Sequence, residues 1–270
     1  VVALPTETVY GLAGNALDPE AVARIFAAKG RPSHNPIIVH VASLWHARQC
    51  TSGWLEVADR LAAAFWPGPL TMVLPKSAAI PDLVTAGGST VGIRWPRHPF
   101  FQAVLRECGF PLAAPSANAS NCLSPTSAEH VLLSLGDRIP LIIDGGQCQV
   151  GIESTVIDLC SQPPRVLRPG MIDELSLTAM LGKLGPGPAV STSTEPLRSP
   201  GQLARHYAPR APLSVLEWTD DRDLRRQLVA QGWMAEDCWV VAHRHLPEPD
   251  ELAGVSVIPH DAEAFARALY

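Results

Sequence analysis

The sequence predicts an α/β fold in which helices flank a twisted mixed sheet, followed by a linker and a second, smaller α/β domain. Two observations support this prediction. The 270 residues are 47% hydrophobic and 17% charged, which supplies enough apolar material for a sizeable core and argues against disorder. Short apolar runs also alternate with helical patterns. Because the sequence contains no run of 18 apolar residues, we expect no membrane-spanning helix.

The strands of the first domain are predicted from short apolar runs bounded by turn-forming residues. The expected strands are Val1–Leu4, Ile37–Val41, Leu70–Leu74, Val91–Trp95, Leu112–Ala114, Leu141–Ile143, Thr155–Leu159 and Val166–Arg168.

Helices are expected between several of these strands. The first begins at Asp18, a good N-cap, followed by a proline whose missing N–H costs nothing in the first turn. Its apolar residues share one face, and Gly30 is a good stop. Similar patterns predict helices over Trp54–Trp66, Phe100–Glu107, Ala128–Leu135 and Glu174–Leu184.

The composition changes near residue 185, and we expect three regions. Residues 1–185 form the first domain, the proline-rich residues 186–212 form a linker without regular structure, and residues 213–270 form a Rossmann-like α/β domain. The chain opens inside a strand-like run without an initiator Met and stops inside a helical pattern, so we expect a fragment with an incomplete second domain. The second domain's expected elements are strands Leu213–Glu217, Trp239–Ala242 and Val255–Ile258 and helices Asp221–Gln231 and Asp261–Tyr270.

Composition and spacing disfavour several functional classes. The net charge of −5 disfavours a dedicated nucleic-acid binder, which is usually basic. The six cysteines are scattered without a C-x-x-C pair, as expected for reduced thiols in a cytoplasmic protein. His243 and His245 have no partners at metal-finger spacing, so we expect a solvated loop there and no metal site.

Common phosphate-loop, dinucleotide and hydrolase motifs are absent, and three local features remain. Lys29 and Arg31, with Asn35 just beyond, could grip a polyphosphate or could simply complement a helix C-terminus. The PSAN segment of residues 115–118 follows a strand, where ligands often bind, but it also fits an ordinary turn. The glycines and hydroxyls of residues 145–155 allow close approach of a ligand or a simple β-turn.

Arg94 and Arg168 lie at the ends of predicted strands. A cation at the end of a buried strand needs an anionic partner, which can be a structural carboxylate or a bound carboxylate or phosphate. Composition does not choose between these partners.

Taken together, the ordered motifs closely resemble the YrdC-like domain of L-threonylcarbamoyladenylate synthases, over residues 1 to about 185. A connector resembling that of the two-domain form follows at residues 199–209. The motifs are LPTETVYGLA, K-G-R-P with NPIIVHV, PGPLTMVLP, TVGIRWP, PSANAS with SPT, IESTVID, VLRPG and SPGQLARHYAP.

The resemblance implies synthesis of L-threonylcarbamoyl-AMP from L-threonine, bicarbonate or CO2, and ATP with Mg²⁺, releasing pyrophosphate. The product would pass to the tRNA threonylcarbamoyl transferase machinery for modification of adenosine in tRNA. Lys29 and Arg31 would be catalytic. The implied threonine contacts are Thr8, His40, Arg94, Ser116 and Ser154, and the implied ATP contacts are Arg31, Asn35, Thr90, Asn118, Thr126, Arg168 and, from the linker, Tyr207.

Two alternatives share this fold. One is a module that binds double-stranded RNA or tRNA, against which the net acidity weighs. The other is a domain of a carbamoyl-transferring maturation factor, whose accompanying modules have no counterpart here. One departure from the family pattern is Asn121–Cys122, which replaces a glycine and a variable residue and predicts a stiffer loop after Asn118.

Overall fold

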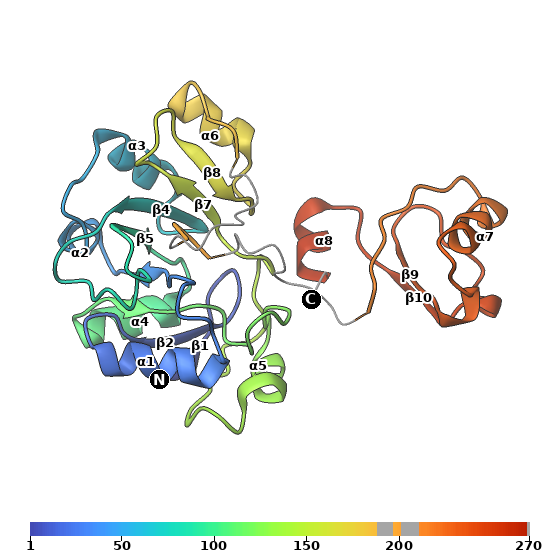
Figure 1. The fold of residues 1–270 in the computed structure, drawn as a ribbon, viewed down its shortest axis with the longest axis horizontal. Helices are drawn as coiled ribbons and strands as arrows, with labels where there is room; N and C mark the ends of the chain where they lie inside the picture. Colours follow the sequence, from blue (N-terminus) through green and yellow to red (C-terminus); the bar gives the residue numbers. More distant parts are fainter. Residues whose placement is uncertain (188–196, 201–210, 269–270) are drawn as a thin grey trace. The chain divides into compact units, whose positions relative to one another are not determined.

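The computed structural model describes residues 1–187, 197–200 and 211–268. The chain divides into two compact units near residue 208 (Figure 1).

A single mixed eight-stranded sheet organises the first unit, as predicted. Its strand order is β1-β2-β6-β3-β5-β4-β7-β8. Only the β3–β5 and β4–β7 pairs are parallel, and the other neighbours are antiparallel. The strands are β1 Val2–Leu4, β2 Gly11–Asn15, β3 Val39–His40, β4 Leu70–Pro75, β5 Thr90–Arg94, β6 Leu112–Ala113, β7 Thr155–Asp158 and β8 Arg165–Arg168.

Helices cover both faces of this sheet. Successive strand residues point to opposite faces, so Ala3 and Leu12 join the larger core, whereas Leu4 and Ala13 join a second core. The larger core receives residues of α1, α3, α5 and α6, and the second receives Phe101 of α4. The helices are α1 Pro19–Lys29, α2 Leu44–Gln49, α3 Glu56–Phe65, α4 Pro99–Cys108, α5 Ala128–Leu135 and α6 Glu174–Leu181.

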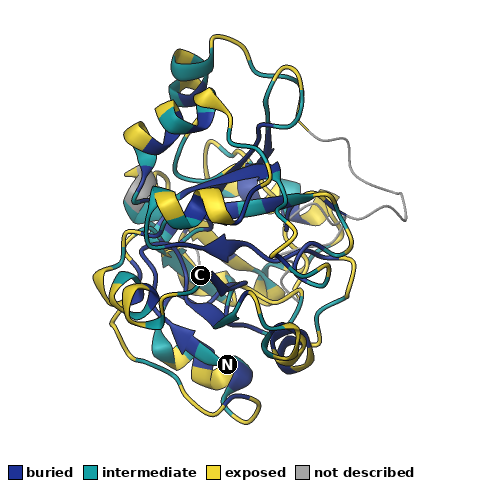
Figure 2. Cartoon of the chain, turned by 90° about the vertical axis from the view of Figure 1, so that its left-hand side faces the viewer, coloured by how far each residue is buried: buried dark blue, intermediate teal, exposed yellow. Residues whose placement is uncertain are grey.

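Burial follows this arrangement. Figure 2 shows the strands mostly buried, while the outward faces of the helices are exposed. Helix α1 begins and ends as predicted: the Asp18 side chain accepts from the Glu20 N–H, and Gly30 adopts a left-handed φ of 60°. None of the described helices is long and apolar enough to cross a membrane.

The second unit is a small α/β unit. Its described residues form two parallel strands, β9 and β10, with β9 contributing Val240 and Ala242 to a core that also holds Leu224 and Leu228. Its elements are α7 Asp221–Ala230, the short 3-10 turns Ala235–Asp237 and Pro249–Glu251, β9 Trp239–Ala242, β10 Gly254–Val257 and α8 Ala262–Ala268.

Several predicted elements differ in the structure. Leu213–Glu217 is not a strand: Val215 is 91% exposed, and the segment has no ladder partner among the described residues. Leu141–Ile143 makes only a single bridge, between Ile142 and Ala3. Strand β2 was not predicted because its glycines have low strand propensity, and α2 was missed because it is only six residues long.

Gly170 packs closely against the backbone that leads into β7, and we expect its replacement by alanine to destabilise the first unit. A Cβ there would lie 2.5 Å from the Thr155 nitrogen and 2.6 Å from the Glu153 oxygen, and both are backbone atoms that cannot give way cheaply. Overpacking of this kind costs about 2 kcal/mol, which corresponds to a melting temperature lower by roughly 4–8 °C.

Thermal unfolding of Gly170→Ala measures this cost. Gly53→Ala is the matched control, because the closest atom to a Cβ at Gly53, apart from its chain neighbours, is a carbon of Pro75 at 4.0 Å. Equal melting temperatures for the two variants would contradict the close packing at Gly170.

Candidate active site

One cavity in the first unit collects side chains from distant parts of the sequence. The sheet topology brings them together. Strands β3, β5 and β8 run in one direction and β7 runs in the opposite direction, so the first three strands end at the edge of the sheet where β7 begins. His40, Arg94 and Arg168 close the first three strands, and Ser154 precedes the fourth. The lining residues are Thr8, Val9, Arg31, Ile38, His40, Arg94, Ala114, Pro115, Ser116, Glu153, Ser154, Arg168 and Pro200.

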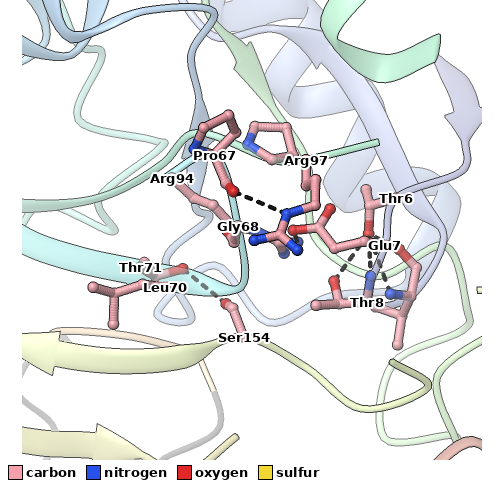
Figure 3. Close-up of polar contacts among 12 residues, drawn as sticks. Thr6, Glu7, Thr8, Pro67, Gly68, Leu70, Thr71, Arg94, Arg97 and Ser154 are labelled. Carbon is pink, nitrogen blue, oxygen red and sulfur yellow. Dashed lines mark hydrogen bonds and ion pairs between the residues drawn. The ribbon is translucent and has the colours of Figure 1, made fainter. Parts of the chain in front are cut away.

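A buried ion pair fixes Arg94 at this edge. The Nη2 atom of Arg94 lies 2.7 Å from Oε1 of Glu7 (Figure 3). Both side chains are buried, with exposed fractions of 5% for Arg94 and 4% for Glu7. The Nε atom of Arg94 also donates to the carbonyl of Gly68 at 3.3 Å. The predicted anionic partner of Arg94 is therefore a structural carboxylate, which the sequence reasoning did not single out although Glu7 lies inside the LPTETVYGLA motif.

The charge state of Glu7 follows from this pairing. Burial alone raises the pKa of the Glu7 carboxyl, but the attraction and hydrogen bonding of Arg94 outweigh it, so the net pKa lies below the ordinary value. Glu7 is therefore ionised at neutral pH and balances one positive charge beside the cavity.

His40 enters the cavity as a neutral imidazole. Burial and then the positive charge of Arg94 lower its pKa to about 3. Its ring packs against Phe101 of α4, with ring centroids 5.2 Å apart. At neutral pH it can therefore offer one hydrogen-bond donor and one acceptor, but no charge.

Arg168 and Thr71 hold Ser154 in place. The Arg168 guanidinium donates to the Ser154 carbonyl from Nε at 3.0 Å and from Nη2 at 2.8 Å. The same Nη2 lies 3.0 Å from the Ser154 hydroxyl, which is also 2.8 Å from the Thr71 hydroxyl (Figure 3). This planar fork orients both the arginine and the serine at the start of β7.

Lys29 does not line the cavity, and its expected contact with phosphates stays a prediction. Its Nζ donates to the carbonyls of Ser116 and Asn118, each at 2.5 Å, and lies 3.4 Å from the Asn118 side-chain oxygen. Burial, followed by repulsion from Arg31, places its pKa well below the ordinary value. These contacts support the PSAN segment from behind, because a buried ammonium must satisfy its donors locally.

Arg31 lines the cavity and is positioned by the residues that follow it. Its Nη2 donates to the side-chain oxygen of Asn35 at 2.7 Å and to the Pro36 carbonyl at 2.6 Å, and its Nε donates to the Asn35 carbonyl at 3.1 Å. Asn35 is buried and does not line the cavity. Its contacts orient Arg31, and its expected contact with ATP stays a prediction.

Three further predicted ATP contacts, Thr90, Asn118 and Thr126, are described in the structure and do not line the cavity. Thr90 begins β5, and Arg94 ends it, about 13 Å further along the strand. Asn118 donates to the carbonyls of Ala119 and Cys122, and the fully buried Thr126 contacts His130. Tyr207 lies outside the described residues.

The loop after Asn118 contains a conformation that explains its unusual residue. Asn121 has a positive φ of 66°. Apart from glycine, asparagine is among the residues that best tolerate this left-handed region, so it can stand at a position where glycine would be expected.

A short piece of the predicted linker also reaches the cavity. Leu197 and Ser199 are buried, and Pro200 lines the cavity. The Nη1 atom of Arg198 lies 2.9 Å from Oδ2 of Asp158, a fully buried carboxylate on β7. This ion pair anchors the segment beside the site, and the sequence alone gave no signal for the pairing.

The lowered pKa of His40 predicts a pH-dependent stability. In the unfolded chain the imidazole titrates near 6.5, so between pH 6.5 and about 3 the unfolded state binds one more proton than the folded state. The contribution of the neutral His40 to the free energy of unfolding is complete above pH 6.5. It declines by about 1.4 kcal/mol per pH unit as the pH falls below that value.

Urea unfolding at several pH values measures this slope. His40→Gln should show a shallower decline between pH 6.5 and 4, whereas His34→Gln, a change at an exposed histidine, should retain the original slope. An unchanged slope in His40→Gln would show that the imidazole is not held neutral.

Two family profiles match the chain. The profile described as telomere recombination (Sua5_yciO_yrdC) covers residues 1–170, and the profile of the threonylcarbamoyl-AMP synthase C-terminal domain covers residues 170–270. The threonylcarbamoyl-AMP synthase of Pyrococcus abyssi is 46% identical over 86% of this chain and 69% of its own length. The enzyme of Bacillus subtilis is 48% identical over 82% of this chain and 64% of its own length.

A solved structure agrees with these matches. The crystal structure of P. abyssi Sua5 complexed with L-threonine superposes with a TM-score of 0.89 at 41% identity, covering 100% of this chain and 79% of that one. The chain spans about two thirds of the length of the two sequence relatives. It belongs to the family of threonylcarbamoyl-AMP synthases, in their two-domain Sua5 form.

Proposed function

We propose that this chain makes L-threonylcarbamoyl-AMP from L-threonine, bicarbonate or CO2, and ATP, with release of pyrophosphate. The observation that carries the proposal is the single cavity lined by Arg31, Arg94 and Arg168 together with small hydroxyls and a neutral histidine. Three guanidinium groups at one site suit a ligand rich in carboxylate and phosphate oxygens.

The amino-acid substrate fits the part of the cavity around Arg94. All five predicted threonine residues, Thr8, His40, Arg94, Ser116 and Ser154, line the cavity. The Arg94 guanidinium, steadied by Glu7, would bind the substrate carboxylate, and the neutral His40 would add a hydrogen bond without competing for charge. The hydroxyls would orient the remaining polar groups of threonine.

ATP would extend toward Arg31 and Arg168, whose guanidinium groups would stabilise charge on the phosphate oxygens as the carbamate oxygen attacks the α-phosphorus. The residues that line the cavity would be held in position by Lys29, Asn35 and Asn118, which do not line it themselves. Thr90, Thr126 and Tyr207 remain proposed nucleotide contacts by family resemblance.

Mg²⁺ fits this site as an ion carried by ATP. Among the described residues no group of three or more His, Cys, Asp or Glu side chains could hold a metal, and Mg²⁺ commonly binds through substrate phosphates and water. When bound, it would neutralise phosphate charge. The protein side chains would bind and orient both substrates and exclude water from the labile carbamate.

The product would be the substrate of the tRNA threonylcarbamoyl transferase machinery, and the reaction would take place in the cytoplasm. Residues 1–185 would form the catalytic domain, residues 186–212 the linker and residues 213–270 the C-terminal domain. Binding of double-stranded RNA is the less favoured function, because the net charge is −5.

Pyrophosphate release tests the proposed reaction. The purified chain should release pyrophosphate from ATP only when L-threonine and bicarbonate are both present, because the carbamate is the nucleophile. Serine should support a lower rate at equal concentration. Release that is independent of bicarbonate, or equal with serine, would contradict the assignment.

Arg31→Ala should separate the two halves of the cavity. Loss of one charge-assisted contact to phosphate weakens binding by about 1.5–3 kcal/mol, so we expect the Kd of a non-hydrolysable ATP analogue to rise roughly 10- to 100-fold. The Kd of L-threonine, measured by calorimetry without nucleotide, should change less than about twofold. Equal weakening of both ligands would show that Arg31 does not face the phosphates.

A further inference from the structure

The cavity contains one acidic side chain that the proposed reaction has not yet used. Glu153 is the single carboxylate among the described residues that line the cavity, and it is 9% exposed. One of its carboxylate oxygens, Oε1, accepts a short hydrogen bond from the hydroxyl of Ser124. No salt bridge between Glu153 and another described residue is formed, in contrast to Glu7 and Asp158.

A buried carboxylate is costly unless a cation stabilises it. The charge of Glu153 acts on the buried Lys29, but the Nζ atom of Lys29 donates to the carbonyls of Ser116 and Asn118 and forms no salt bridge with Glu153. Ser124 satisfies one oxygen but supplies no charge. Two cationic lining residues already have other partners: Arg168 donates to Ser154, and Arg31 donates to Asn35. A substrate cation would therefore complete the site.

The charge pattern of an α-amino acid matches this need. A zwitterion presents a carboxylate and an ammonium group separated by a single carbon, so its site needs a cation and an anion close together. Arg94 supplies the cation, but Glu7 is already paired with it and does not line the cavity. Glu153 is left as the anion that can face the ammonium group.

The backbone places Glu153 on the amino-acid side of the cavity. It immediately precedes Ser154, and its loop runs along the segment that carries Thr8: the Val150 N–H donates to the Glu7 carbonyl at 2.8 Å, and the Gly151 N–H donates to the Thr8 carbonyl at 3.1 Å. Ser154 and Thr8 both belong to the expected set of threonine contacts. Gly170 packs against the Glu153 carbonyl.

We propose that the Glu153 carboxylate binds the α-ammonium group of L-threonine, opposite the Arg94 guanidinium that binds its carboxylate, with Ser124 orienting the Glu153 side chain. The assignment rests on the proposed function and adds the residue that requires the substrate to be an amino acid. It also explains why a cavity with three arginines retains a carboxylate: phosphate and carboxylate ligands alone would be repelled by it.

Calorimetry with two ligands tests this role. L-threonine and 3-hydroxybutanoate share the carboxylate and the side-chain hydroxyl, but the second lacks the amino group. Glu153→Gln keeps the size and hydrogen-bonding reach of the side chain and removes its charge. We expect the Kd of L-threonine to rise about 10- to 100-fold, as for loss of one charged hydrogen bond, while 3-hydroxybutanoate binds as well as before or more tightly.

The matched control is Glu129→Gln, the same change at an exposed position of α5, which should leave both affinities unchanged. Melting curves establish that the variants fold. If Glu153→Gln does not fold, Glu153→Asp is used for the test, because it keeps the charge but withdraws it by about one carbon–carbon bond. This variant should raise the Kd of L-threonine and leave that of 3-hydroxybutanoate unchanged.

Three outcomes would overturn the inference: unchanged L-threonine affinity in the variants, equal weakening of both ligands, or a raised Mg²⁺ requirement for pyrophosphate release with L-threonine affinity intact. The last result would assign Glu153 to the metal. Failure of the proposed function is distinguishable, because in that case the unaltered chain would bind neither L-threonine nor its analogue and would release no pyrophosphate.

Discussion

The ion pair between Glu7 and Arg94 is the constraint on which the site depends. Two charges taken out of water are tolerated only when they are paired closely, and removing one partner of such a pair typically costs about 3–5 kcal/mol. This pair joins the loop after β1 to the end of β5, at 2.7 Å. It keeps Arg94 at the cavity wall and lowers the pKa of Glu7, and the nearby Arg94 charge adds to the larger effect of burial in holding His40 neutral.

Backbone carbonyls also orient the other cationic residues of the site. Lys29 donates to the carbonyls of Ser116 and Asn118, Arg31 to those of Asn35 and Pro36, and Arg168 to that of Ser154. A carbonyl orients a cation without carrying a charge that would neutralise it. Preorganised charge of this kind is how an enzyme can stabilise a phosphoryl transition state without a covalent nucleophile.

The sequence predicted the mixed α/β sheet and most of its strands, because burial on both faces leaves clear apolar runs such as those of β4 and β7. It missed β2, whose glycines hide a strand, and misplaced a strand at Leu213–Glu217, where local alternation has no partner to pair with. In the candidate site, resemblance located the lining residues around Arg94. It could not separate residues that face the cavity from those that support it, such as Lys29 and Asn35, and it passed over Glu7 and Glu153. Direction of a side chain and long-range ion pairs depend on tertiary contacts that local patterns do not encode.

The central claim is that one cavity holds both substrates, with the amino acid against Arg94 and the triphosphate toward Arg31 and Arg168. A crystal structure of the chain with L-threonine and a non-hydrolysable ATP analogue measures this most directly. The account predicts density for both ligands in this cavity, the threonine carboxylate within hydrogen-bonding distance of Arg94 and phosphate oxygens near the other two arginines. Well-ordered density for either ligand elsewhere on the chain, with this cavity occupied only by solvent, would contradict it.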